Sequence, residues 1–121
     1  MLEIVLDRVS ELPVVRLTGS LVLGTPAESF RAAVHQLVAE GRANVICHVA
    51  GITTFDSTGL AALIAARDTL HRAGGRLVLV QPSMRLQTLL KTTRLISMFQ
   101  IAEDEAAAVH ALGSNWPQGQ P

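Results

Sequence analysis

The side chains with the clearest potential for chemistry are Asp56, Ser57 and Thr58, which follow one another just before an alanine-rich stretch. At the start of a helix such oxygens form an N-cap by accepting backbone hydrogens of the first turn, and Gly59 would allow this turn to pack closely. A hydroxyl there can also carry a phosphoryl group, which adds about −1.5 to −2 charge at pH 7 and is stabilised by the helix dipole. The residues alone leave a structural cap, by Asp56 or Ser57, and a phosphorylation switch at Ser57 equally open.

Nucleophilic catalysis is a third interpretation of Ser57, because the motif Gly-x-Ser-x-Gly carries the nucleophile of many hydrolases on a strand-to-helix turn. Phe55 stands where that motif requires its first glycine, and no acid and histidine follow in a recognisable order. A hydrolase would lose ester turnover on Ser57→Ala, and we expect no such activity.

The other residues with metal-binding or redox chemistry are His35, His48, His71, His110 and Cys47. No histidine has a second ligand at helical spacing, and the adjacent Cys47 and His48 point to opposite faces of a predicted strand. No dinucleotide-binding or phosphate-binding glycine loop is present. We therefore predict no metal, no cofactor, and structural or surface roles for these five residues.

Two half-buried β-strands are predicted at residues 3–9 and 13–18, where apolar and polar residues alternate. In the first, Ile4 and Leu6 would face the core. Aliphatic runs at 44–50 and 76–81 are typical of strands covered on both faces. The sequence therefore predicts a hairpin followed by two central strands.

The first predicted helix begins at Pro26 and ends at Gly41. Thr25 and Glu28 form a capping box, in which each side chain satisfies a backbone N–H of the other. Apolar residues then recur every three or four positions. This is the most clearly marked element of the chain.

Further helices are predicted over about 58–73, from a cap at Ser83 to about residue 91, and from 105 to 112 after a cap at Asp104. Residues 95–101 fit either a strand or a packed connector. A strand, a helix and a second strand in succession imply a right-handed parallel crossover. The chain is therefore assigned to the α/β class.

Composition limits the function classes further. The 121 residues are 49% hydrophobic and 17% charged, and ten Lys and Arg balance ten Asp and Glu, so no basic field is available for nucleic acid. The single cysteine, the N-terminus without a secretory signal, and the lack of an apolar run of about 18 residues indicate a cytoplasmic protein without membrane insertion. We expect one domain over residues 1–112 and a flexible C-terminal tail over 113–121.

The order of these elements and the motif Asp56-Ser57-Thr58-Gly59-Leu60 resemble the STAS domain family, shared by anti-sigma-factor antagonists and the cytoplasmic tails of sulphate transporters. The resemblance covers about residues 3–112, and its most specific part is this motif after an aliphatic strand. It implies a STAS-type α/β fold, with a mixed four- to five-stranded sheet and about four helices mainly on one face.

The resemblance also implies a function. In antagonists of this family, the serine after the aspartate is phosphorylated by a serine kinase that is also the anti-sigma factor, and a phosphatase resets it. Here that serine is Ser57, and the switch consists of Asp56, Ser57, Thr58 and Gly59. The loop beside it is expected to contribute to the contact surface with the partner, through Ser20, Leu21, Val22, Gly24 and Thr25. The chain would then be a bacterial transcription regulator and not an enzyme.

One departure keeps a second hypothesis open. The chain reads Gly19-Ser20-Leu21-Val22 where many antagonists have Gly-Glu-Leu-Asp, so both acidic contacts are absent. The alternative is a STAS ligand-binding or scaffolding module of a signalling or transport assembly, never phosphorylated. In the tail, Trp116 could dock on a second copy, which leaves a homodimer open.

Overall fold

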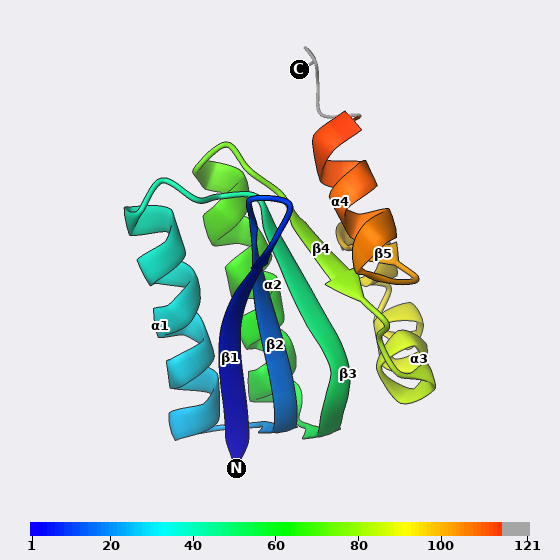
Figure 1. The fold of residues 1–121 in the computed structure, drawn as a ribbon. Coiled ribbons are helices and arrows are strands. Elements are labelled where there is room, and N and C mark those ends of the chain that lie inside the picture. Colours follow the sequence, from blue (N-terminus) through cyan, green and yellow to red (C-terminus); the bar gives the residue numbers. More distant parts are fainter. Residues whose placement is uncertain (115–121) are drawn as a thin grey trace.

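The computed structural model describes residues 1–114 and shows a five-stranded mixed sheet with four α-helices and one short 3-10 helix in that range (Figure 1). The strands lie in sequence order, β1-β2-β3-β4-β5. The elements are β1 (Leu2–Val9), β2 (Leu12–Leu21), α1 (Thr25–Ala39), β3 (Val45–Phe55), α2 (Ser57–Arg72), β4 (Leu77–Val80), α3 (Met84–Thr92), the 3-10 helix η1 (Ile96–Met98), β5 (Gln100–Ala102) and α4 (Glu105–Ser114). The predicted fold class is confirmed.

Strands β1 and β2 form an antiparallel hairpin, and the other neighbouring pairs are parallel. The hairpin turn consists of Ser10 and Glu11, with φ of 51° and 69°, the left-handed conformation that matches the twist of the strands. On β1, Ile4 packs on the core as predicted. The prediction for Leu6 is wrong: it is 54% exposed on this edge strand and packs against neither core.

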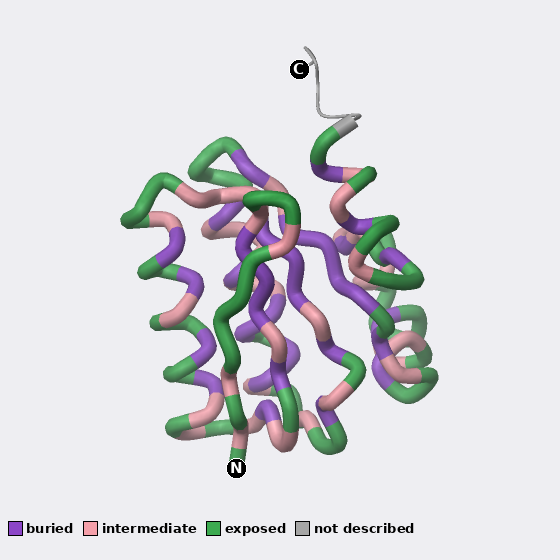
Figure 2. Tube along the Cα trace, viewed as in Figure 1, coloured by how far each residue is buried: buried purple, intermediate pink, exposed green. Residues whose placement is uncertain are grey.

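Both faces of the sheet are covered, but unequally. The larger core lies between the sheet and α1, α2 and α3, while a smaller core lies under α4 on the other face. Alternate residues of one strand serve the two cores: Val15 of β2 lies in the larger and Val14 in the smaller. Figure 2 shows the central strands buried and the outer helix surfaces exposed. The helices therefore lie mainly on one face of the sheet, as predicted.

The start of α1 differs from the predicted capping box. The helix begins at Thr25, and its N-cap is Gly24, with φ of 99° and no side-chain hydrogen bond. The Gly24 carbonyl accepts from the Glu28 N–H at 3.0 Å. Thr25 is already helical, so its hydroxyl is not in the capping position. The predicted capping box is therefore wrong, because Gly24, with its positive φ, lets the helix begin one residue earlier than predicted.

Strand β3 is longer than predicted. It continues to Phe55 instead of ending near residue 50, and it pairs with β2 as far as Leu21 opposite Phe55. Gly51 lies beside an irregularity in this pairing, where a Cβ atom would lie 2.8 Å from the Leu17 carbonyl oxygen. As a result only Asp56 separates the end of β3 from the first residue of α2.

The C-terminal elements follow the prediction in part. Residues 95–101 were predicted as either a packed connector or a strand, and they form both: the 3-10 helix η1 is followed by the short strand β5. The cap at Asp104 is confirmed: its Oδ1 accepts from the Ala107 N–H at 2.8 Å. Helix α4 runs to Ser114, two residues into the expected tail. The rest of that tail, with Trp116, lies outside the described residues.

Candidate functional site

The carboxylate of Asp56 connects two segments that are far apart in the sequence. Asp56 is the N-cap of α2, and its Oδ1 accepts from the Gly59 N–H at 2.8 Å. Its Oδ2 accepts from the Leu23 N–H at 3.1 Å, in the loop between β2 and α1. These backbone hydrogen bonds, first from Gly59 and then from Leu23, hold the pKa of the Asp56 carboxyl below its usual value. The loop before α1 is therefore fastened to the first turn of α2.

Ser57 is the first residue of α2, and its side chain is exposed. Of the two candidate caps, Asp56 is the one that accepts the first-turn N–H. Within residues 1–114, the Ser57 hydroxyl makes no hydrogen bond. Thr58, the next residue, is half-buried. The capping role and the free hydroxyl therefore belong to different residues of the motif.

Gly59 sets how closely α2 approaches β2. A Cβ atom at this position would lie 1.9 Å from the carbonyl oxygen of Leu21 and 2.8 Å from its carbonyl carbon. The backbone of α2 thus packs directly on the last residue of β2, as the sequence predicted for this glycine. Leu21 itself is fully buried. Any side chain at 59 would displace the turn that carries Ser57.

The other predicted loop residues surround this contact. Ser20, Val22 and Gly24 are half-buried, and Thr25 is exposed. Leu21 belongs to the core, so its side chain does not present a surface to a partner. The residue that joins the loop to Asp56 is Leu23, whose own side chain is 71% exposed.

Three helices begin at this edge of the molecule. Helices α1, α2 and α3 follow the carboxyl ends of β2, β3 and β4, which are parallel and therefore end at one edge of the sheet (Figure 1). The start of α3 is capped by Ser83, whose Oγ accepts from the Leu86 N–H at 3.1 Å, as predicted. Helix N-termini carry partial positive charge. This edge therefore favours added negative charge.

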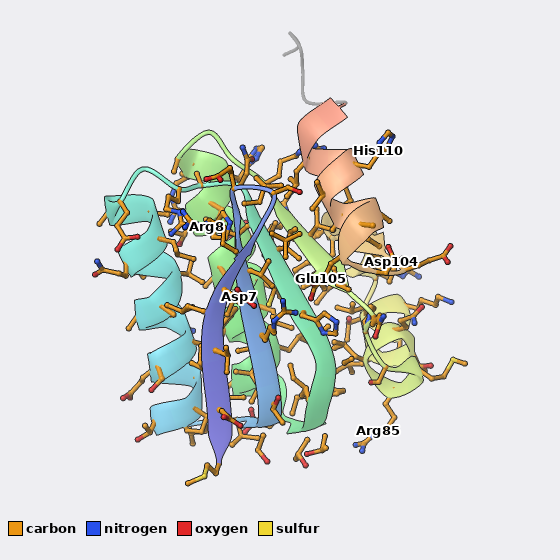
Figure 3. All side chains as sticks on the ribbon, in the orientation of Figure 1. Asp7, Arg8, Arg85, Asp104, Glu105 and His110 are labelled. Atoms are coloured by element: carbon orange, nitrogen blue, oxygen red, sulfur yellow. The ribbon has the colours of Figure 1, made fainter. Side chains whose placement is uncertain are left out.

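An open groove of about 690 Å³ lies between the start of α2 and α3. Its only cation among residues 1–114 is Arg85, whose guanidinium carbon lies 5.7 Å from the centroid of the Phe55 ring. Arg85 projects from α3 at the edge where β3 ends (Figure 3). Met84, on the groove wall, is 78% exposed. The groove is lined by Phe55, Asp56, Ser57, Leu60, Met84, Arg85, Thr88, Leu89, Thr92 and Thr93.

Sequence reasoning did not identify the α3 side of this groove. The Ser83 cap marks where α3 begins, but nothing in the residue pattern indicates that α3 lies beside the start of α2. Arg85 has no partner of opposite charge nearby in sequence that would single it out. One feature of the sequence could have indicated this side of the groove: α3 comes directly after β4, and helices that follow parallel strands begin at the same edge of the sheet.

A second polar cluster lies on the other face of the sheet. Arg16 of β2 bonds to Glu105 of α4 and, at 3.0 Å, to Asp7 of β1, whose carboxylates lie on the same side (Figure 3). His48 Nε2 lies 3.7 Å from Glu105 Oε2. The hydrogen bonds that Arg16 donates, first to Glu105 and then to Asp7, raise the pKa of its guanidinium. This cluster fastens α4 to the hairpin and is separate from the groove.

The remaining candidate chemistry has structural explanations. Cys47 is fully buried in the larger core, and burial raises the pKa of its thiol to about 12, so it behaves as a small apolar residue. Within residues 1–114, no group of three or more His, Cys, Asp or Glu could hold a metal ion. In the same range no helix combines the length and apolar character of a membrane span.

Comparison with known proteins gives consistent matches. A family model described as the STAS domain matches residues 3–108. A structure described as that of a candidate anti-sigma factor antagonist from Thermotoga maritima superimposes with a TM-score of 0.82 at 17% identity, covering 90% of this chain and 93% of that one. The structure of the Bacillus cell fate determinant SpoIIAA in its phosphorylated form superimposes with a TM-score of 0.71 at 23% sequence identity. The match covers 90% of this chain and 99% of that one. The structure of the murine anion transporter Slc26a9 superimposes with a TM-score of 0.71 at 16% sequence identity, and the match covers 90% of this chain and 19% of the transporter.

Proposed function

The chain belongs to the STAS domain family, and we propose that within this family it is an anti-sigma-factor antagonist controlled by phosphorylation of Ser57. In the unphosphorylated form it binds an anti-sigma factor that is also a serine kinase, and so releases a sigma factor for transcription. The kinase transfers the γ-phosphoryl group of ATP to Ser57 Oγ, which gives up its proton as ADP leaves, and the complex dissociates. A phosphatase restores the binding form. The proposed setting is the bacterial cytoplasm, and the protein itself has no catalytic role.

The observation that carries the proposal is the free, exposed hydroxyl of Ser57 at the first position of α2. Because Asp56 caps the helix, Ser57 can be modified without removing the cap. The N-termini of three helices lie at this edge and stabilise negative charge. SpoIIAA, a structural neighbour, is described both in unphosphorylated and in phosphorylated form. The site thus suits a reversible phosphate.

The charges around the groove explain how a phosphate would prevent binding. In the unmodified groove, the single positive charge of Arg85 balances the negative charge of Asp56. A phosphate adds about −1.5 to −2 charge to this otherwise largely apolar wall. A partner surface that accepts a neutral hydroxyl would have to remove the phosphate from water, and the single charge of Arg85 cannot neutralise both Asp56 and the phosphate. The complex with the partner is therefore lost, while the folded domain is preserved.

The proposal is tested by measuring the affinity for a candidate anti-sigma kinase encoded near this gene. Wild type and Ser57→Ala are expected to bind equally, and Ser57→Asp at least about tenfold more weakly. Ser10→Asp is the matched control, because it adds the same charge in the β1–β2 turn, at a residue outside the groove. Equal affinity for all four proteins would contradict the switch.

The second candidate function is an unphosphorylated module of a transport or signalling assembly. It is favoured by the similarity to part of an anion transporter and by the two acidic residues that are missing from the first loop. Intact-mass measurement of protein purified from its native host separates the two candidates. A species heavier by about 80 Da, absent from Ser57→Ala, supports the antagonist. A single unmodified mass under every growth condition supports the module.

A further inference from the structure

We propose that Arg85 is the intramolecular partner of a phosphate on Ser57, so that modification rearranges the groove as well as charging it. The inference rests on the proposed phosphorylation of Ser57 and adds a residue on α3 to that switch. It concerns the regulation of the site: the phosphorylated form would have a changed groove, in which Arg85 faces Ser57 and no longer covers Phe55.

The position of Arg85 favours this pairing. Arg85 and Ser57 line the same groove from its two sides, and Arg85 lies over the ring of Phe55, two residues before Ser57. Arg85 is exposed and projects toward the edge where β3 ends (Figure 3). A long, exposed arginine side chain can swing from a ring to a neighbouring phosphate without movement of the backbone.

The charges around Arg85 leave its guanidinium available for a phosphate. Within residues 1–114, Arg85 makes no ion pair, and it is the only cation that lines the groove. Among the described residues that line the groove, the acidic one is Asp56, whose two oxygens already accept from the N–H groups of Gly59 and Leu23. Arg85 is therefore available, and the carboxylate that could compete for it is held elsewhere.

The Phe55 ring and a phosphate on Ser57 differ in how strongly they attract the Arg85 guanidinium. The Phe55 ring attracts the guanidinium only through its quadrupole, and weakly at an exposed site. A phosphate offers up to two full negative charges and three acceptor oxygens, with which arginine forms paired, charge-assisted hydrogen bonds. The phosphate is therefore the stronger partner, and its arrival uncovers the face of Phe55.

The test uses protein with phosphoserine incorporated at position 57 during synthesis, so that no kinase is needed. The second pKa of this phosphate, ordinarily about 6, is measured by phosphorus NMR in wild type, Arg85→Gln, Arg85→Lys and Arg72→Gln. Loss of the cation in Arg85→Gln is expected to raise this pKa by about 0.5 to 1 unit, and Arg85→Lys to give an intermediate value. Arg72→Gln is the matched control, because Arg72 is exposed at the other end of α2.

A second measurement follows the side chain itself. The Cδ protons of Arg85 should be shifted upfield by the Phe55 ring in unphosphorylated protein, and should lose that shift when Ser57 carries phosphate. Equal phosphate pKa values in wild type and Arg85→Gln, or Arg85 protons that do not respond to the phosphate, would overturn the pairing. Thermal melts of the unphosphorylated variants check that each is folded.

These outcomes are separate from those of the proposed function. If Arg85 does not pair with the phosphate, the affinity difference between wild type and Ser57→Asp still decides the switch. If Ser57 carries no phosphate in the native host, the antagonist proposal fails, whereas the NMR titration of installed phosphoserine still reports on Arg85.

Discussion

Replacement of Gly59 by alanine tests the close contact between α2 and β2. An alanine Cβ would lie 1.9 Å from the Leu21 carbonyl oxygen, whereas real Cβ contacts are essentially never shorter than 3.0 Å. The helix would have to move by about 1 Å, and overpacking of this kind costs about 1 to 3 kcal/mol. Alanine regains about 1 kcal/mol through its higher helix propensity. Because the Leu21 oxygen belongs to the backbone and cannot rotate away, we expect an overpacking cost near the upper end of this range. After the gain in helix propensity, the net loss in the free energy of unfolding is about 2 kcal/mol.

The assay is urea denaturation followed by circular dichroism, analysed by linear extrapolation. For a domain of this size, a loss of about 2 kcal/mol corresponds to a fall in Tm of roughly 8 °C. Gly113→Ala in α4 is the matched control, because a Cβ there meets nothing within 4 Å. It should leave stability unchanged or raise it slightly. Gly59→Ala that is as stable as wild type would refute the reasoning that the contact with Leu21 is rigid.

Three further predictions concern the groove and the core. Asp56→Ala should lower stability at pH 7, because the folded pKa of this carboxyl is lowered. The ionic contribution of Asp56 is fully present above the unfolded pKa of about 3.9 and is lost as pH falls through the folded pKa, so the difference between variant and wild type in urea melts should be largest at pH 7 and should shrink as the pH is lowered below about 4. Cys47 should resist thiol reagents at pH 8 in native protein and react fully in urea, and reaction of the folded protein at the rate of a free thiol would contradict its burial. Met84→Ala, at an exposed position, should change the free energy of unfolding by less than about 0.5 kcal/mol and yet weaken binding to the anti-sigma kinase in a calorimetric titration, whereas unchanged affinity would remove α3 from the contact surface.

Local signals in the sequence were reliable where one residue determines the backbone. The caps at Ser83 and Asp104 form as predicted, since each side chain bonds to an N–H three residues ahead. The capping box at Thr25 fails because a competing local solution, the left-handed Gly24, starts the helix first. The end of β3 was missed for another reason: a glycine and two threonines resemble a turn, and only pairing with β2 makes them a strand.

The candidate site was predictable in its motif and not in its surroundings. Asp56 and Ser57 are neighbours in sequence, so their place at a strand-to-helix junction could be inferred. The hydrogen bond from Leu23 to Asp56 spans 33 residues, and the contact of Arg85 with Phe55 depends on how α3 packs beside the end of β3. Such contacts are set by tertiary structure, which leaves no periodic trace in the sequence.

The sequential order of the strands has a consequence for how the protein is made. Because the sheet grows in one direction, from β1 to β5, each strand can add to an edge formed by residues already synthesised. Every residue of the loop, the α2 turn and the groove precedes residue 94, whereas β5 and α4 come later. All residues of the surface that carries Ser57 are therefore synthesised before β5 and α4, so this surface can begin to form on a nascent chain that still lacks both elements.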